Sequence, residues 1–161
     1  MSTACFVCER IQQIATHSNP YFVRELETGY VVIGDYQLFR GYSLFLCKQH
    51  VSELHHLAPA FKLKFLEEMS LVAQAVYNWV RPVKLNYELL GNAEPHLHWH
   101  LFPRHQDDPN PLGPTWQVSH EIRYAETCKP SPDEVQRLTR ELDQTLTRVL
   151  SLRLAGGVPL S

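Results

Sequence analysis

Residues 96–104 read HLHWHLFPR, and this stretch decides both the fold and the chemistry expected of the chain. Histidines occupy alternate positions in it: His96, His98 and His100. Successive side chains of a β-strand point to opposite faces, so a strand here presents all three imidazoles together. The opposite face is then apolar: Leu97, Trp99 and Leu101. On an α-helix the same spacing would spread the imidazoles around the axis, and the alternation therefore predicts a strand.

The size and composition of the chain are those of an ordinary globular protein. Its 161 residues, of which 44% are hydrophobic and 20% charged, are enough to bury a core, and residues 1–161 are predicted to form a single domain. A net charge of −2 without a basic stripe argues against a nucleic-acid partner, although a free nucleotide needs only a local cluster of donors. The sequence shows no signal-peptide layout, no apolar run long enough for a membrane, and only four cysteines. We therefore expect a cytoplasmic protein without a membrane partner.

Patterns along the rest of the chain predict an antiparallel sheet with helices. The expected strands are residues 21–26, 30–33, 42–47, 83–89 and the histidine stretch. Apolar residues at helical spacing from Phe61 to Trp79 predict a long helix, and residues 131–134, SPDE, form a capping box that begins a second. A shorter helix is expected over residues 5–16. Since the connections between strands are short, these elements predict an α+β fold with about five antiparallel strands and two main helices.

A Cys-x-x-Cys motif, Cys5 to Cys8, stands at the start of the first expected helix. Such a pair can be redox-active, although no strand precedes it as in a thioredoxin-like fold. The two cysteines can also be small core residues, or half of a zinc site. The chain has no second Cys-x-x-Cys, so a zinc site would need histidines as its other ligands. The motif alone leaves these alternatives open.

Three polar residues near the expected strands are candidates for binding a substrate. Asn92 lies in a turn before the histidine stretch, where its amide could donate to a phosphate oxygen or simply cap the turn. Asn86 lies inside an otherwise apolar strand and needs a partner, which is either structural or a substrate. Asp35 ends a strand and is either a turn residue or a ligand contact.

The alternating histidines point to chemistry at phosphorus or to a metal. A neutral imidazole nitrogen is a competent nucleophile, and the middle residue, His98, is best placed for that role. His96 and His100 could then orient the site or donate to the scissile phosphate. Ligands at i, i+2 and i+4 of one strand rarely all reach one tetrahedral ion, so a metal site shared with the cysteines is easier to build.

The segment HLHWHLF resembles the alternating histidine motif of the histidine triad (HIT) superfamily, whose members hydrolyse or transfer nucleotides at an α-phosphate. The resemblance extends from CFVC through GYSLFLCKQHV to LNYELLGNAEPHLHWHLFPR, which is about residues 5–104. It implies a HIT-like core there and a homodimer in which two sheets join into one. The remaining residues, 105–161, hold a loop region and the second long helix, and they have no counterpart that we can place.

The resemblance also implies roles for individual residues. His98 resembles the nucleophile that forms a nucleotidyl-histidine intermediate, and His100 resembles the histidine that contacts the phosphate and the bridging oxygen. Asn92 stands where relatives often have a glutamine that touches phosphate, and Asn86 is similar to an upstream active-site asparagine. Asp35 resembles the acidic residue that binds the ribose hydroxyls.

Some members of the superfamily hold a structural zinc ion, and the resemblance implies a ligand set for it here: Cys5, Cys8, His50 and His96. The two histidines would supply the ligands that the Cys-x-x-Cys motif lacks. No organic cofactor is expected.

Residues beside the triad indicate a branch of the superfamily. Pro103 and Arg104 resemble the dinucleoside polyphosphate hydrolases, whereas Ala93 stands where the phosphoramidase branch usually carries a serine. The expected activity is therefore hydrolysis of a dinucleoside polyphosphate at an α-phosphate. A purine nucleoside phosphoramidase is the alternative within the superfamily, and a non-catalytic, zinc-stabilised nucleotide-binding protein is the alternative outside enzymes.

Overall fold

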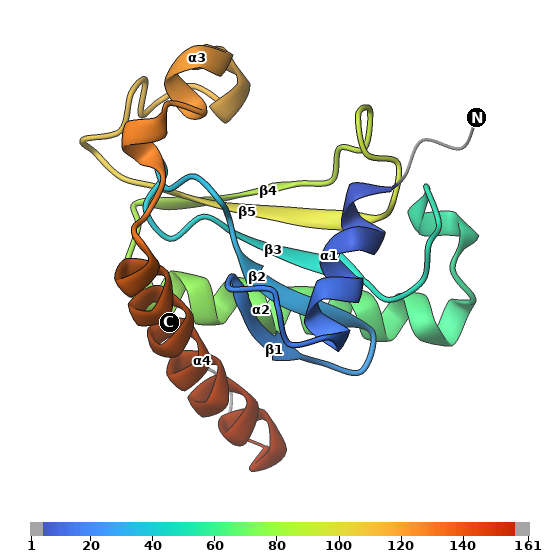
Figure 1. The fold of residues 1–161 in the computed structure, drawn as a ribbon. Helices are drawn as coiled ribbons and strands as arrows, with labels where there is room; N and C mark the ends of the chain where they lie inside the picture. Colours follow the sequence, from blue (N-terminus) through green and yellow to red (C-terminus); the bar gives the residue numbers. More distant parts are fainter. Residues whose placement is uncertain (1–4, 157–161) are drawn as a thin grey trace.

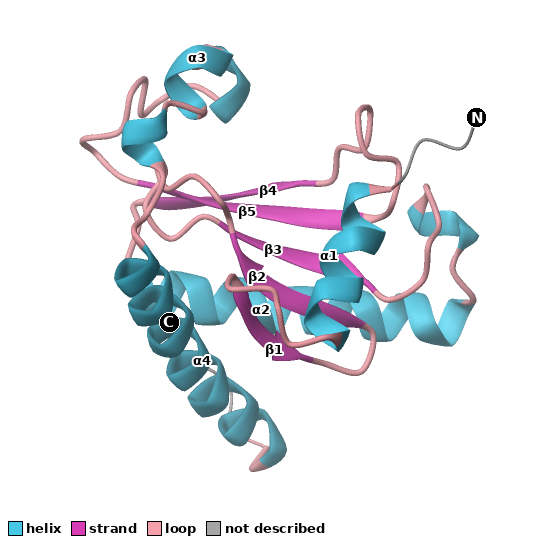
Figure 2. Cartoon of the chain, viewed as in Figure 1, coloured by secondary structure: helices cyan, strands magenta, loops and turns pink. Residues whose placement is uncertain are grey.

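The computed structural model describes residues 5–156, which form one five-stranded antiparallel sheet flanked by helices (Figures 1 and 2). The strands are β1 (Phe22–Glu25), β2 (Gly29–Ile33), β3 (Ser43–Cys47), β4 (Lys84–Glu88) and β5 (His98–Arg104). The α-helices are α1 (Phe6–Ala15), α2 (Pro59–Val80), α3 (His120–Arg123) and α4 (Pro132–Leu154). Single-turn 3-10 helices lie at Leu54–His56, Thr115–Gln117 and Glu126–Cys128. The predicted fold class, with its two long helices, is confirmed.

The strands follow the order β1-β2-β3-β5-β4, which puts the histidine strand β5 between β3 and β4. Leu44 of β3 stands opposite His100, and Glu88 of β4 stands opposite the same residue on the other side. Directly opposed residues of antiparallel strands share a face. Side chains from three strands therefore converge around the histidines.

Helices cover both faces of the sheet (Figure 1). Alternation along the strands supplies two apolar surfaces: Val31 and Phe45 pack against the α2 side, whereas Val32 and Leu46 pack against α1. Helix α4 packs on α2 and on β1, and its apolar residues join the main core: Leu138, Leu142, Leu146 and Val149. The C-terminal helix is thus part of the structure that holds the sheet.

The long helices begin where the sequence indicates. The Ser131 side chain accepts a hydrogen bond from the backbone N–H of Glu134, and Pro132 occupies the first turn of α4. Helix α2 has Pro59 in its first turn and ends at Val80, after which Arg81 adopts a left-handed conformation with φ 48°. None of the described helices is long and apolar enough to cross a membrane.

The histidine strand is shorter than the alternation predicts. It begins at His98, so His96 lies two residues before β5. The backbone N–H of Leu97 donates to the carbonyl of Val51, and the N–H of Cys47 donates to the carbonyl of Leu97. The chain at His96 is therefore bonded to the end of β3 and to the turn that follows it, and this separates His96 from the other two histidines.

Candidate functional site

A cavity of about 520 Å³ lies on the face of the sheet that carries α1, a size typical of small-molecule sites. It is bordered by α1, by the segments that follow β2 and β4, by β3 and β5, and by the end of α3. Four predicted site residues line it together: Asp35, Asn92, His98 and His100.

The two cavity histidines contact one another directly. Nε2 of His98 lies 2.9 Å from Nε2 of His100, and Nδ1 of His100 lies 2.7 Å from the Tyr42 hydroxyl. On the other side, Nδ1 of His98 lies 2.6 Å from the carbonyl oxygen of His96. These contacts form a continuous row of hydrogen bonds, which runs from the Tyr42 hydroxyl through the rings of His100 and His98 to the His96 carbonyl.

The row fixes the position of each proton, because a carbonyl oxygen can only accept. Nδ1 of His98 must donate to the His96 carbonyl, so a neutral His98 keeps its lone pair on Nε2. Nε2 of His100 then donates to that lone pair, and Nδ1 of His100 accepts from the Tyr42 hydroxyl. The arrangement presents an unprotonated nitrogen of His98 at the cavity and one N–H of His100 beside it.

Burial keeps the outer members of this row neutral. Desolvation, followed by the nearby His98, lowers the pKa of His100 from 6.5 to about 3. Desolvation raises the pKa of Tyr42 well above its usual value, so its hydroxyl keeps the proton that it donates. The hydrogen-bond pattern of the row therefore persists at neutral pH.

The lowered pKa of His100 makes the free energy of unfolding depend on pH in a defined direction. The unfolded chain binds a proton at His100 from pH 6.5 downward, whereas the folded chain does so only near pH 3, so stability is lost as the pH falls through this window. At pH 5 the loss is about 2 kcal/mol. We expect urea unfolding at pH 7.5 and pH 5 to show a smaller acid loss for His100→Gln than for wild type. The exposed-site variant His56→Gln should behave as wild type, and equal losses in all three proteins would contradict the assignment.

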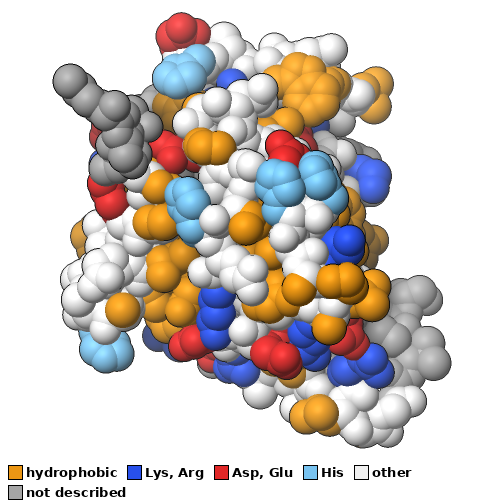
Figure 3. Space-filling model, turned by 90° about the vertical axis from the view of Figure 1, so that its right-hand side faces the viewer, with side chains coloured by type: hydrophobic (Ala, Val, Ile, Leu, Met, Phe, Trp, Pro, Cys, Tyr) orange, Lys and Arg blue, Asp and Glu red, His pale blue; other side chains and the backbone are white. Residues whose placement is uncertain are grey.

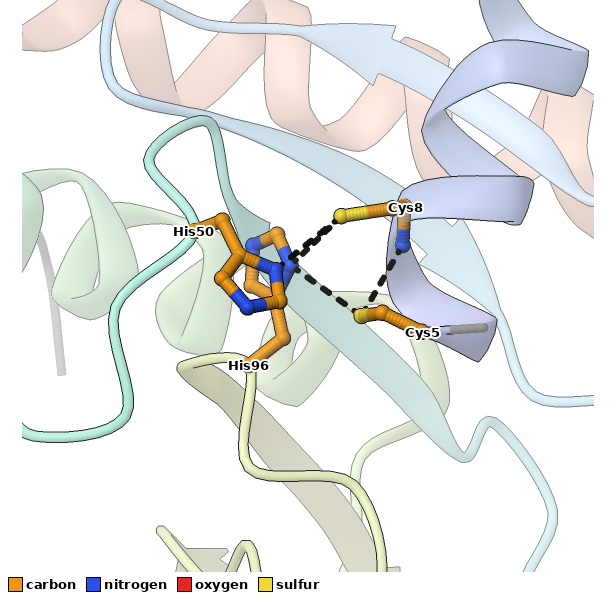
Figure 4. Close-up of side chains that lie close together, drawn as sticks. All are labelled: Cys5, Cys8, His50 and His96. Carbon is orange, nitrogen blue, oxygen red and sulfur yellow. Dashed lines mark hydrogen bonds between the residues drawn. The ribbon is translucent and has the colours of Figure 1, made fainter. Parts of the chain in front are cut away.

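Cys5, Cys8, His50 and His96 form a second cluster, at the start of α1 (Figure 4). Sγ of Cys8 lies 3.1 Å from Nδ1 of His50 and 3.4 Å from Nδ1 of His96, and Sγ of Cys5 lies 3.6 Å from the same His96 nitrogen. One candidate ligand atom from each residue lies within 4.8 Å of all the others. Zinc bonds of about 2.0–2.3 Å in a tetrahedron place neighbouring ligands about 3.3–3.8 Å apart. The two spacings to His96 fall in this range, and the spacing between Cys8 and His50 is slightly shorter.

The protonation of His96 also suits a metal ligand. Its Nε2 lies 2.8 Å from the Cys47 carbonyl oxygen and must donate to it, which leaves the Nδ1 lone pair facing the two thiols. Burial lowers the pKa of His96, so the ring is neutral. Desolvation and the neighbouring Cys5 raise the pKa of Cys8, an effect that a bound cation would oppose. The described cluster thus has the donor set of a Cys2His2 zinc site.

The remaining predicted substrate contacts differ in their surroundings. Asp35 lines the cavity and accepts a hydrogen bond from Arg10 of α1. Asn92 lines the cavity from the turn after β4. The Asn86 side chain instead accepts from Nη1 of the buried Arg104, at 3.2 Å, and lines a separate, smaller hollow. The structure therefore does not bring Asn86 together with the four predicted residues that line the cavity.

Several cavity residues were missed by sequence reasoning. Tyr42 precedes β3, and its alternation with Leu44 and Leu46 would have placed it on the histidine face had the pairing of β3 with β5 been known. Glu88 lines the cavity and accepts from Thr115 at 2.6 Å, with both residues buried. Arg123 reaches the cavity from α3, and no pattern in its neighbourhood indicates this.

Charges on the outer surface are mixed. On the face shown in Figure 3, acidic and basic side chains lie beside one another, with hydrophobic side chains between them. This agrees with the small net charge of −2.

Comparisons with known proteins identify a domain in the chain. The HIT domain family model matches residues 35–107, which include β5 and most of the cavity strands. No curated protein matches the sequence.

Solved structures similar to the chain share its fold. One is a histidine triad protein from Bradyrhizobium japonicum, 22% identical over 78% of this chain and 89% of its own, with a TM-score of 0.68. A hypothetical histidine triad nucleotide-binding protein from Sulfolobus tokodaii is 18% identical, with 90% and 95% covered and a TM-score of 0.69. A zinc-bound histidine triad family protein from Mycobacterium smegmatis is 18% identical, with 92% and 96% covered and a TM-score of 0.62.

These identities show a common fold rather than a common activity, and the family itself rests on the matched domain together with the histidine strand. The sheet, the paired cavity histidines and the HIT domain match agree with one another. Residues 35–107 of the chain are therefore a HIT domain, the domain of the histidine triad superfamily.

Proposed function

We propose that this protein hydrolyses dinucleoside polyphosphates through a covalent nucleotidyl-histidine intermediate on His98. The observation that carries the proposal is the unprotonated Nε2 of His98 at the cavity wall, where its lone pair accepts from the N–H of His100 while Nδ1–H is held by the His96 carbonyl. A nucleophile oriented in this way needs no separate base.

In the first step, Nε2 of His98 forms a bond to the α-phosphorus, and the bond from that phosphorus to the bridging oxygen breaks. The N–H of His100, which donates to His98 in the structure, becomes available to a phosphoryl or bridging oxygen. The leaving nucleotide departs as an anion that is stable without a proton. Water then adds to the phosphorus, the N–P bond breaks, and the nucleoside monophosphate leaves with His98 restored.

The remaining roles follow from position in the cavity. Asn92 is proposed to donate its amide to a phosphate oxygen and Asp35 to accept from the ribose hydroxyls, with Arg10 holding the Asp35 carboxylate in place. His96 contributes through its carbonyl oxygen rather than through its ring. Asn86 already has Arg104 as a structural partner, and we leave it out of the proposed contacts.

Zinc is proposed as a structural ion held by Cys5, Cys8, His50 and His96. It would fix the start of α1 against the segment before β5, and it takes no part in the steps above. We also propose that a homodimer forms through β4, which among the described residues pairs only with β5. Tyr87 of β4 and Val83, just before the strand, are both exposed.

The test is product analysis with purified protein and a small panel of substrates. The panel holds diadenosine tri- and tetraphosphate, adenosine 5′-phosphoramidate and an ADP-sugar. We expect AMP to be released from the polyphosphates, and quenching with denaturant at alkaline pH, where the N–P bond survives, to trap an AMP adduct that mass spectrometry places on His98. Cleavage of the phosphoramidate alone would favour the other branch of the superfamily. Binding of AMP without cleavage of any compound would favour a non-catalytic nucleotide-binding protein.

A further inference from the structure

Glu88, the last residue of β4, is a buried carboxylate in the wall of the histidine cavity. Only 8% of the residue is exposed, and its Oε1 accepts a hydrogen bond from the Thr115 hydroxyl at 2.6 Å. Within residues 5–156 the carboxylate forms no ion pair. A buried charge is costly unless it is paired, and one bond from a neutral hydroxyl offsets little of that cost. The fold alone therefore does not account for a carboxylate at this position.

The register of the sheet places Glu88 beside His100. The two residues are direct partners in the β4–β5 pairing, so their Cβ atoms lie about 4.5–5.5 Å apart on one face of the sheet. On its other side His100 is opposite Leu44 of β3, whose side chain has no polar group. Glu88 is thus the ionisable side chain that stands opposite His100 in these two strand pairings.

A carboxylate opposes the binding of phosphate, because two negative charges at close range repel each other. A reaction step that consumes a base would offset this cost, and the proposed reaction has one. The water that attacks the nucleotidyl-histidine must lose a proton, and it enters opposite Nε2 of His98, where the bridging oxygen stood, because entering and leaving groups lie in line at phosphorus. His100, whose N–H is proposed to serve an oxygen of the same phosphate, borders the reacting phosphorus.

Other groups of the cavity are poorly suited to take that proton. His98 is bonded to phosphorus at this stage. His100 carries a proton on Nε2, and its Nδ1 accepts the hydrogen bond that ends the row. The other acidic side chains of the cavity wall already accept hydrogen bonds from α1: Asp35 from Arg10, and Glu94 from the backbone N–H of Phe6. Glu88 is the acidic side chain that remains.

We propose that Glu88 is the general base of the second step, which activates the water that releases the nucleoside monophosphate. This inference rests on the proposed function, since it takes the nucleotidyl group on His98 as the species that reacts. As the water oxygen bonds to phosphorus, the Glu88 carboxylate takes one of the water protons. The N–P bond breaks, and its electron pair returns to Nε2 of His98. The proton passes from Glu88 to solvent when the product leaves, and Thr115 holds the carboxylate in place through its hydrogen bond.

Glu88→Gln tests this inference, because glutamine keeps the shape of the side chain and can accept from Thr115 but is not a base. In rapid mixing with diadenosine tetraphosphate, we expect the variant to release about one ATP per chain in a first phase at close to the wild-type rate. Later turnover should be about 100-fold slower or more. Quenching with denaturant at alkaline pH should then find the AMP adduct on nearly every chain. The control Glu121→Gln changes an exposed residue outside the cavity and should match wild type in both phases.

Fluoride separates the loss of a base from damage to the cavity. Fluoride is an anion, so it forms a bond to phosphorus and displaces His98 without having a proton to lose. It should therefore discharge the adduct of Glu88→Gln as adenosine 5′-phosphorofluoridate at least as fast as it discharges the adduct of wild type. A distorted cavity would instead slow the attack of fluoride and of water alike.

An adduct that does not accumulate in Glu88→Gln would overturn the inference, and so would an adduct that fluoride discharges as slowly as water does. Slower release of ATP in the first phase would also overturn it, because Glu88 would then act in the first step or on the fold. If wild type forms an adduct and both proteins hydrolyse it equally fast, only the role of Glu88 fails. If wild type forms no adduct with any compound of the panel, the proposed function fails and this inference fails with it.

Discussion

Alanine in place of His98 should lower the turnover of every substrate by at least about 10⁴-fold, because no other group in the cavity can take over the attack on phosphorus. Nε2 of His100 carries the proton in the resting row, and its other nitrogen accepts from Tyr42. His96 turns its ring away, toward the Cys47 carbonyl and the thiols. The covalent AMP adduct should disappear together with turnover, which steady-state kinetics and mass spectrometry of the quenched protein would record.

Two controls separate loss of the nucleophile from loss of the fold. His55→Ala removes an exposed histidine outside the cavity and should retain the wild-type rate. In His98→Gly, added imidazole can enter the space left by the ring, and we expect it to restore part of the rate. A His98→Ala protein that still turns over at a tenth of the wild-type rate would show that the reaction proceeds without this nucleophile.

Serine in place of Cys8 should cause the largest loss of stability among the substitutions considered, provided that the protein has been purified with zinc. A bound ion stabilises the folded chain in proportion to the logarithm of its concentration over its Kd, about 4 kcal/mol at 1,000 times Kd. For a chain of 161 residues this corresponds to a fall in Tm of about 8–16 °C. Removing the ion from wild type with a chelator should lower Tm by a similar amount, and metal analysis should find one zinc per chain only in wild type.

Cys128→Ser is the matched control, because Cys128 lies outside the cluster and its thiol donates only to the Ile122 carbonyl. It should keep both the zinc and the Tm of wild type. If chelation leaves the Tm of wild type unchanged, then Cys5, Cys8 and their histidine neighbours are merely packed together. Chelation should leave the Tm of Cys8→Ser almost unchanged, since that protein has little bound metal to lose.

Local patterns predict the parts of this structure that local physics determines. The alternation in residues 96–104 predicts a strand with an apolar side, and Leu97, Trp99 and Leu101 do pack in the α2-side core. The capping box at Ser131 predicts the start of α4, and its side chain does accept from Glu134. In each case the residues that determine the element are close together in the sequence, so the sequence pattern alone is enough to predict it.

The contacts that shape the cavity join residues that are far apart in sequence. Tyr42 meets His100 across the β3–β5 pairing, and Thr115 meets Glu88 from a loop beyond the sheet. No periodicity relates the members of these pairs, and only the three-dimensional path of the chain brings them together. Arg123 is the extreme example, because its position depends on the whole connection between β5 and α4.

Asn86, by contrast, is a residue whose need for a partner is visible in the sequence, although the identity of that partner is not. A polar residue in an apolar strand correctly indicates a buried partner, but the sequence cannot show whether that partner belongs to the protein or to a ligand. Here Arg104, on the neighbouring strand, supplies it. The buried Arg104 also donates to Asp108 and to the carbonyls of Asn110 and Gly113, and so holds the loop after β5 in place.

One residue belongs to both clusters of this protein. The ring of His96 faces the thiols of Cys5 and Cys8, while its carbonyl oxygen holds the ring of His98. We therefore expect occupancy of the metal cluster to be coupled to binding of a nucleotide in the cavity. If an ion at the thiols improves the affinity for nucleotide by some factor, thermodynamic reciprocity requires that nucleotide tighten the hold on the ion by the same factor. The supply of a metal that never touches the substrate would then regulate how readily the cavity fills.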